Sequence, residues 1–160
     1  MSAIFDASRE GQELELRLIS DQVMGGVSRG SLSREEVAGR LAARMTGDVR
    51  LENGGGFIQI AGDLPKRVRR ARGLVIQVFG NGETYGCHLR TTDVARPWQS
   101  FRQAFSAPAE WTRVELPFEA FTPHRIDAPL RVEALTRIGL IGIGRAFHAD
   151  LAVSRIALLQ

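Results

Sequence analysis

GLVIQVFGNGETYGCHLRTT, residues 73–92, decides the fold class. Its first run, 73–80, is rich in β-branched residues and bounded by glycines, which is typical of a strand. Asn81-Gly82 follows, and this dipeptide between two apolar runs predicts a hairpin because both central turn residues need a positive φ. The run 84–92 alternates polar and apolar residues, so it is expected to be the return strand with one buried face.

Similar short strand signals continue on both sides of this predicted hairpin. They cover residues 13–20, 39–47, 55–62, 100–107, 110–118, 135–144 and 147–158. The runs 100–107 and 110–118 are expected to pair with each other, and the last two runs are expected to be strands joined at Gly144. Strands of this number with glycine turns and no βαβ rhythm predict one all-β sandwich spanning residues 1–160.

Helical signals are confined to two short segments. Residues 33–45 permit a turn or two of helix, with Ser33 as N-cap and Glu36 as its capping-box partner. Residues 129–135 permit another. Neither segment is long enough to anchor a fold.

The composition is that of an ordinary soluble globular protein. The 160 residues are 44% hydrophobic and 24% charged, and no apolar run approaches the roughly 20 residues of a membrane span. The N-terminal sequence lacks a basic region followed by an apolar one, so no secretory signal is expected. A single cysteine, Cys87, excludes an intrachain disulfide, and the chain is therefore expected to be cytoplasmic.

The positive charge does not by itself predict nucleic-acid binding. The net charge is +3, and Lys66 is the single lysine, so arginine supplies nearly all of it. The arginines are scattered, and most have an acidic residue nearby. The basic stretch KRVRRAR, 66–72, could contact an anionic partner, but a solvated loop is the favoured interpretation. No nucleic-acid partner is expected.

The loop sequence DQVMGGVSRG, 21–30, is the most unusual motif. It lacks the lysine and helix start of a phosphate loop, and its Gly-x-Ser-x-Gly match lacks the strand-turn-helix context of a nucleophile elbow. Gly25 and Gly26 are expected to allow a tight turn, with Asp21 and Ser28 bridging it by side-chain to backbone hydrogen bonds. Met24 either plugs into the core or is presented as a soft apolar contact, and the core is favoured. Asn53 opens a second glycine loop of this kind.

A polar and aromatic segment, 90–105, holds the other candidate binding residues. Arg90, Trp98, Gln99 and Arg102 belong to one strand-loop-strand unit. Trp98 can stack on a sugar, a base or a partner's side chain, or it can cover one end of the sandwich, and both alternatives stay open. The three histidines are far apart without metal-ligand spacing, so no metal, cofactor or catalytic residue is expected. Calcium held by loop carbonyls stays an open possibility.

Several motifs in order resemble one known family. They are SDQVMGGVS (20–28), NGGGFIQI (53–60), GNGETYGCHLRT (80–91), WQSFRQAF (98–105) and Trp-x-x-Val-x-Leu-Pro-Phe-x-x-Phe (111–121). Together they resemble the complex I intermediate-associated protein family, from about Leu14 to the C-terminus. The resemblance implies a galactose-binding-like β-sandwich, a jelly roll of two antiparallel sheets. It also implies a role like that of relatives that help assemble NADH dehydrogenase.

The resemblance carries over residue by residue. The matching positions are Asp21, Val23, Met24, Gly25, Gly26, Ser28, Gly55, Gly56, Phe57, Tyr85, Arg90, Trp98, Phe105, Trp111, Pro117, Phe118 and Phe121. The sequence departs from the pattern at LRLIS, 16–20, where relatives often carry a tryptophan. The chain looks like a minimal bacterial member.

Three functional hypotheses follow. The first is a non-enzymatic binding or scaffolding module for a protein complex, NADH dehydrogenase subunits among the candidates, using one loop end formed by 21–30, 52–56 and 90–102. The second is a carbohydrate-binding module with Trp98, Tyr85 and Arg90 as platform. The third is a hydrolase using Asp21 or Ser28. The candidate binding residues are Asp21, Met24, Gly25, Gly26, Ser28, Asn53, Tyr85, Arg90, Trp98, Gln99 and Arg102.

Overall fold

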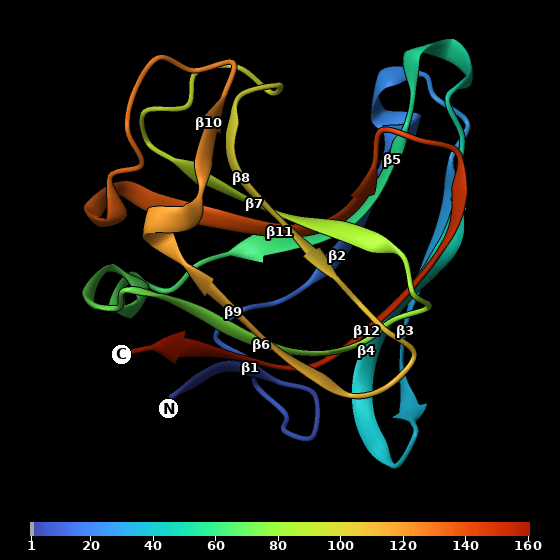
Figure 1. Cartoon of the computed structure of the whole chain (residues 1–160), viewed down its shortest axis with the longest axis horizontal. Coiled ribbons are helices and arrows are strands. Elements are labelled where there is room, and N and C mark those ends of the chain that lie inside the picture. The colour runs from blue at the N-terminus through green and yellow to red at the C-terminus, as the bar shows by residue number, and fades with distance from the viewer. Residues whose placement is uncertain (1) are drawn as a thin grey trace.

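Two antiparallel sheets pack face to face in the computed structural model, which describes residues 2–160 (Figure 1). Sheet I runs in the spatial order β3 (Arg29–Val37), β4 (Arg40–Val49), β12 (Phe147–Leu159), β6 (Gly73–Phe79) and β9 (Thr112–Pro117), with β1 (Ala3–Asp6) beside β12. Sheet II runs in the order β10 (Thr122–His124), β8 (Ser100–Ser106), β7 (Thr84–Thr91), β11 (Leu135–Ile143), β5 (Phe57–Asp63) and β2 (Arg17–Ser20). The predicted all-β sandwich of two antiparallel sheets is confirmed.

Helical structure within residues 2–160 is limited to short 3-10 turns. These are η1 (Asp21–Met24), η2 (Glu52–Gly54), η3 (Lys66–Arg70), η4 (Phe118–Ala120) and η5 (Val132–Ala134). The basic stretch 66–72 forms η3 and its exit. There Arg67 forms an ion pair with Glu13 at 2.6 Å, and the Nε of Arg72 donates to the carbonyl of Gln160 at 2.6 Å. These two arginines therefore hold chain segments together.

The core lies between the sheets and follows the period-2 pattern of the strands. On β7, Cys87 and Leu89 point inward and are fully buried, whereas His88 and Arg90 between and after them point outward. Burying a large apolar side chain of this kind stabilises the fold by about 1.5–3 kcal/mol. Because alternate side chains of each strand point into the core, the remaining side chains of sheet II form one outer face, which is turned away from sheet I.

Two predicted strand pairs are wrong. The Asn81-Gly82 turn reverses the chain, but β6 enters sheet I and β7 enters sheet II. The same crossing separates β8 from β9 and β11 from β12. At the first turn, the Asn81 side chain donates to the carbonyl of His148 at 2.9 Å, and the Gly82 amide donates to Ala107 at 2.8 Å. The turn therefore bridges the two sheets at one end of their strands.

The expected helix at 33–45 is a β-hairpin. β3 and β4 pair in register from Arg29 opposite Asp48 to Val37 opposite Arg40. Ala38 and Gly39 make the turn with φ values of 45° and 86°, the positive pair that a two-residue hairpin requires. The cross-strand ladder overrides the N-cap signal at Ser33, because long-range pairing satisfies the same backbone groups.

Candidate functional site

The loop 21–30 is built around the buried carboxylate of Asp21. Asp21 begins η1 directly after β2 and is 0% exposed. Its oxygens accept from the backbone amides of Ser28 (2.9 Å), Gly56 (2.6 Å) and Phe57 (3.2 Å), and from the hydroxyl of Ser28. One carboxylate therefore ties the start of β3 to the start of β5. We call this arrangement the Asp21 brace.

The glycines of both motifs make room for the Asp21 brace. A Cβ added to Gly26 would lie 2.5 Å from the Asp21 Cγ, and one added to Gly55 would lie 2.5 Å from its Oδ2. Gly25 ends η1 with φ 84°, a left-handed conformation that favours glycine. The predicted bridging role of Asp21 and Ser28 across a tight glycine turn is thus what the structure shows.

The Ser28 hydroxyl is fully committed to this network. It donates to Asp21 and accepts from the Arg50 amide at 2.8 Å, and Ser28 is 0% exposed. Within residues 2–160 no hydrogen bond joins Ser28 to a histidine, and the residues after it enter strand β3 rather than a helix. The geometry therefore gives the third hypothesis, a hydrolase using Asp21 or Ser28, no reachable nucleophile.

The ionised form of the Asp21 carboxylate is stabilised by hydrogen bonds rather than by a cation. Burial acts to raise the pKa of Asp21, but the hydrogen bonds from Ser28, Gly56 and Phe57 outweigh it, so the pKa is lowered. A carboxylate that accepts several hydrogen bonds from backbone amides stays ionised even when buried. The brace is therefore intact over the neutral pH range.

Met24 lies outside the core, so the expected plug is wrong. Met24 is 62% exposed and its neighbour Val23 is 75% exposed, since the short η1 turn directs both side chains away from the brace. Leu51, just before η2, is 49% exposed. The brace holds η1 and η2 side by side (Figure 1). We call Val23, Met24 and Leu51 the apolar tip; exposed Asn53 sits beside it on η2 with φ 59°.

A second group of candidate residues lies on and beside the loop 92–99, between β7 and β8. Gln99 holds this loop: its Oε1 accepts from the amides of Ala95 (2.9 Å) and Arg96 (3.0 Å), and its Nε2 donates to the carbonyl of Arg125 (3.1 Å). Trp98 is 55% exposed on the same loop. Arg102, on β8, donates from Nε to the Ser100 hydroxyl at 2.9 Å.

The two loop groups were expected to form one surface at a single end of the sandwich. They do not. In sheet II, Ile143 pairs with Phe57 beside the apolar tip. Arg137 pairs with both Asp63 and Arg90 at the other end of the same strands, where the loop 92–99 begins. The loops thus flank the outer face of sheet II from opposite ends. Sequence order could not show this, because strand direction and register decide it.

Tyr85 faces the interior. It is 2% exposed; its hydroxyl donates to the Asn81 Oδ1 at 2.6 Å and accepts from the Asp150 amide at 2.9 Å. Burial raises its pKa to about 12. The side chain joins the two sheets, so its ring is not available to a ligand at the surface.

Titratable groups suited to metals are dispersed. Within residues 2–160 no three histidine, cysteine or acidic side chains lie close enough to hold a metal ion. Cys87 is buried and burial raises the pKa of its thiol, while His88 points to the opposite face of β7. Among the same residues, no helix is long and apolar enough to cross a membrane.

The sequence reasoning missed part of the outer face of sheet II. The additional polar side chains there are Gln59, His88, His124 and Arg137. Each occupies an outward position of a different strand, so period-2 alternation could have marked each one separately. Only the strand order brings them together.

The fold defines the class of protein as a galactose-binding-like β-sandwich. A family 11 carbohydrate-binding module of the cellulosomal cellulase Lic26A-Cel5E of Clostridium thermocellum is similar over 98% of this chain and 91% of its own, with a TM-score of 0.75 and 12% identity. A family 11 module from the same organism, in complex with a β-1,3-1,4-mixed-linked tetrasaccharide, also has a TM-score of 0.75, with 10% identity over 98% and 94% of the two chains. A family 30 carbohydrate-binding module has a TM-score of 0.67, with 12% identity over 99% and 87%.

The sequence places the chain more narrowly. The model of the complex I intermediate-associated protein 30 family matches residues 5–151. The chain therefore belongs to this family, and the resemblance stated from the motifs is confirmed. Among curated protein sequences, no relative matches it.

Proposed function

We propose that this protein is a non-enzymatic binding module that helps to assemble or stabilise a protein complex. The observation that carries the proposal is the rigid presentation of the apolar tip. Val23 and Met24 have the two largest exposures among the large hydrophobic side chains within residues 2–160, yet they follow directly from a buried and fully hydrogen-bonded carboxylate. Methionine and exposed apolar side chains on a fixed loop suit a protein interface.

The partner we propose is a subunit or intermediate of complex I. The support is the family to which the chain belongs, whose description names this complex. The outer face of sheet II, flanked by the apolar tip and the loop 92–99, is the proposed contact surface. Arg102 lies on this face and Trp98 on the flanking loop, and both are residue types enriched in the energetic centres of interfaces.

The test is affinity purification from the native host followed by mass spectrometry. Complex I subunits are expected with the wild-type bait, and Val23→Ser/Met24→Ser is expected to lower their recovery on the order of tenfold, about 1.4 kcal/mol. The matched control is Leu41→Ser, since Leu41 is 39% exposed on the β3–β4 hairpin, away from this surface. Equal losses in the control, or no complex I subunits with the wild type, would refute the proposal.

A second candidate function is carbohydrate binding, and exposed Trp98 is the observation that favours it. An indole ring at a loop surface can stack on a pyranose. The originally expected platform is reduced to Trp98 and Arg90, since Tyr85 is buried. A glycan array with wild type and Trp98→Ala tests this candidate. Retained binding by the variant, or no bound glycan at all, would exclude Trp98 as a sugar platform.

A further inference from the structure

The outer face of sheet II carries cationic side chains in adjoining rows across the strands. One row, read from the strand register, is Thr122, Arg102, His88, Gly139, Ala61 and Arg17. In the next row Arg90 lies opposite Arg137, and Arg137 lies opposite Asp63. Three arginines from three neighbouring strands, Arg102, Arg90 and Arg137, therefore project from the same end of one face.

The described part of the chain, residues 2–160, gives these arginines no ion-pair partner. Among residues 2–160, no ion pair involves Arg90, Arg102 or Arg137. The Arg102 Nε bonds only the neutral Ser100 hydroxyl. The carboxylate nearest in register is Asp63, exposed at the end of β5, and it makes no ion pair with Arg137. Within residues 2–160 no ion pair therefore neutralises these arginines, although Arg137 lines a hollow that also includes Glu13, Glu15 and Asp63.

The directions of the pKa shifts of Arg90, Arg102 and His88 agree with an excess of positive charge on this face. Burial and then Arg137 lower the pKa of Arg90, and burial and then Arg125 lower that of Arg102. Burial, followed by the charges of Arg102 and His124, lowers the pKa of His88 to about 3. On sheet I the reverse holds: the hydrogen bonds that Arg44 donates to Asp150 and Glu35 raise the pKa of Arg44. An excess of positive charge around Arg90 and Arg102 thus marks this part of the outer face of sheet II.

Between these cationic side chains the surface of sheet II includes small residues, and we call this part of the surface the floor. Gly139 and Gly86 lie on adjacent strands in its middle, and Ala61 continues the floor on β5. A Cβ at Gly139 would collide with the Gln59 Oε1, and one at Gly86 would lie 3.2 Å from the His88 Nε2. Gln59 and His88 therefore lie flat over the glycines. Within residues 2–160 the side chains of Gln59 and His88 make no hydrogen bond, so a ligand on this floor would find free polar groups.

The spacing suits carboxylates on an extended chain. Neighbouring strands lie about 4.8 Å apart, and diagonal neighbours across strands lie about 7–8 Å apart. Alternate side chains of an extended peptide repeat about every 6.6–6.8 Å on one side. Guanidinium groups bind carboxylates through two parallel hydrogen bonds, which lysine cannot do. The arginine rows therefore match acidic residues at alternate positions.

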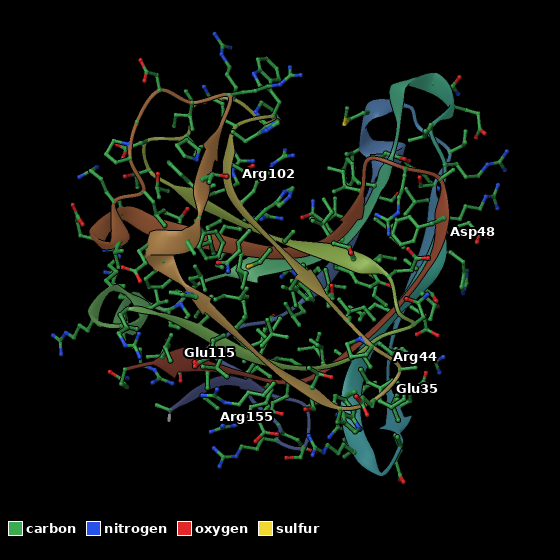
Figure 2. The ribbon with its side chains drawn as sticks, in the orientation of Figure 1. Glu35, Arg44, Asp48, Arg102, Glu115 and Arg155 are labelled. Carbon is green, nitrogen blue, oxygen red and sulfur yellow. The ribbon has the colours of Figure 1, made fainter. Side chains whose placement is uncertain are left out.

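We propose that the outer face of sheet II binds an extended, carboxylate-rich segment of a protein partner through Arg90, Arg102 and Arg137. The inference rests on the proposed function and names the chemistry of the partner. An acidic peptide is favoured over an acidic glycan because no exposed aromatic ring lies among these arginines in the described chain; Trp98 is on the flanking loop. Figure 2 shows Arg102 on β8, far from the labelled charges of sheet I.

The test uses a synthetic peptide of alternating glutamate and alanine, with alternating glutamine and alanine as the uncharged probe. The full-length protein is expected to bind the glutamate peptide at least about tenfold more tightly, and more weakly as salt rises. Arg90→Gln/Arg102→Gln/Arg137→Gln is expected to lose at least about tenfold in affinity. The control Arg9→Gln/Arg70→Gln/Arg113→Gln removes the same charge from other surfaces and should change affinity less than about twofold.

Three results would overturn the inference: no binding by the wild type, equal loss in both triple variants, or tighter binding of polygalacturonate than of the peptide. Melting curves of both triple variants exclude unfolding, and Arg→Lys at the same three positions should retain only part of the affinity. Affinity purification separates this inference from the proposed function. If the triple Gln variant still captures complex I subunits, only the acidic-segment inference fails; if the wild type captures none, the proposed function fails.

Discussion

The two ends of sheet II hold charged side chains in opposite ways. At one end, the Asp21 carboxylate is fully buried and accepts four hydrogen bonds from the chain itself. At the other end, Arg90 and Arg137 lie side by side, with no ion pair to either within residues 2–160. A charge whose partners are all internal serves the fold, whereas charges left without internal partners are available to a ligand.

The largest expected effect tests the braced end. Asp21→Ala leaves the donors of Ser28, Gly56 and Phe57 without an acceptor, and it should lower the free energy of unfolding by about 3–5 kcal/mol. Urea denaturation measures this. Asp63→Ala, an exposed carboxylate at the far end of β5, is the control and should stay within about 0.5 kcal/mol. Similar values for both variants would remove the distinction between the two ends.

Two glycine-to-alanine substitutions, one beside the Asp21 brace and one on the outer face of sheet II, sharpen the comparison. Gly26→Ala places a Cβ against the buried Asp21 carboxylate, which cannot move without breaking the brace, and should cost about 2–3 kcal/mol. Gly139→Ala meets only the end of the Gln59 side chain, which can swing away, and should cost less than about 1 kcal/mol. Both are read from urea denaturation. The reverse order would mean that the floor of the outer face is the rigid element.

Acid titration gives a smaller effect with a fixed sign. Hydrogen bonds lower the folded-state pKa of Asp21 below its ordinary value of 3.8 despite burial. Its stabilisation is therefore complete above about pH 4 and is lost as the pH falls through the lower folded pKa. The free energy of unfolding of wild type minus that of Asp21→Asn should shrink over this range. A difference that grew on acidification would contradict the lowered pKa.

The smallest expected effect concerns the end of sheet II that carries Arg90 and Arg137. Arg90→Gln/Arg137→Gln removes two like charges whose proximity lowers the pKa of Arg90, burial being the larger cause. The free energy of unfolding should change by no more than about 0.5 kcal/mol, in the stabilising direction. Thermal and urea melts at low salt measure it. A marked loss of stability would show that these arginines have a structural role.

The local pattern predicted strands well but not their partners. Period-2 alternation located β6, β7, β11 and β12 to within a residue or two, because alternate burial leaves its mark along each strand. The Asn81-Gly82 turn was correctly placed as a reversal. The pairing of β6 with β7 was predicted wrongly, because a tight turn at the end of a strand can also lead into the opposite sheet.

The candidate site was predictable only where its residues are close in sequence. Asp21 and Ser28 lie within one loop, so their bridging role was readable from the glycines between them. Met24 was misplaced because exposure depends on how η1 is held against η2, which is a contact between distant segments. The arginine rows on sheet II likewise depend on the order of β8, β7 and β11.

The ends of the chain meet on the sheet opposite the proposed contact surface. β1 pairs with the last part of β12, and the Leu158 amide donates to the Ser2 carbonyl at 2.9 Å. Figure 1 shows both termini beside sheet I. A tag, an immobilisation linker or a fused neighbour attached at either terminus would therefore orient the molecule the same way, with the outer face of sheet II directed toward the surroundings.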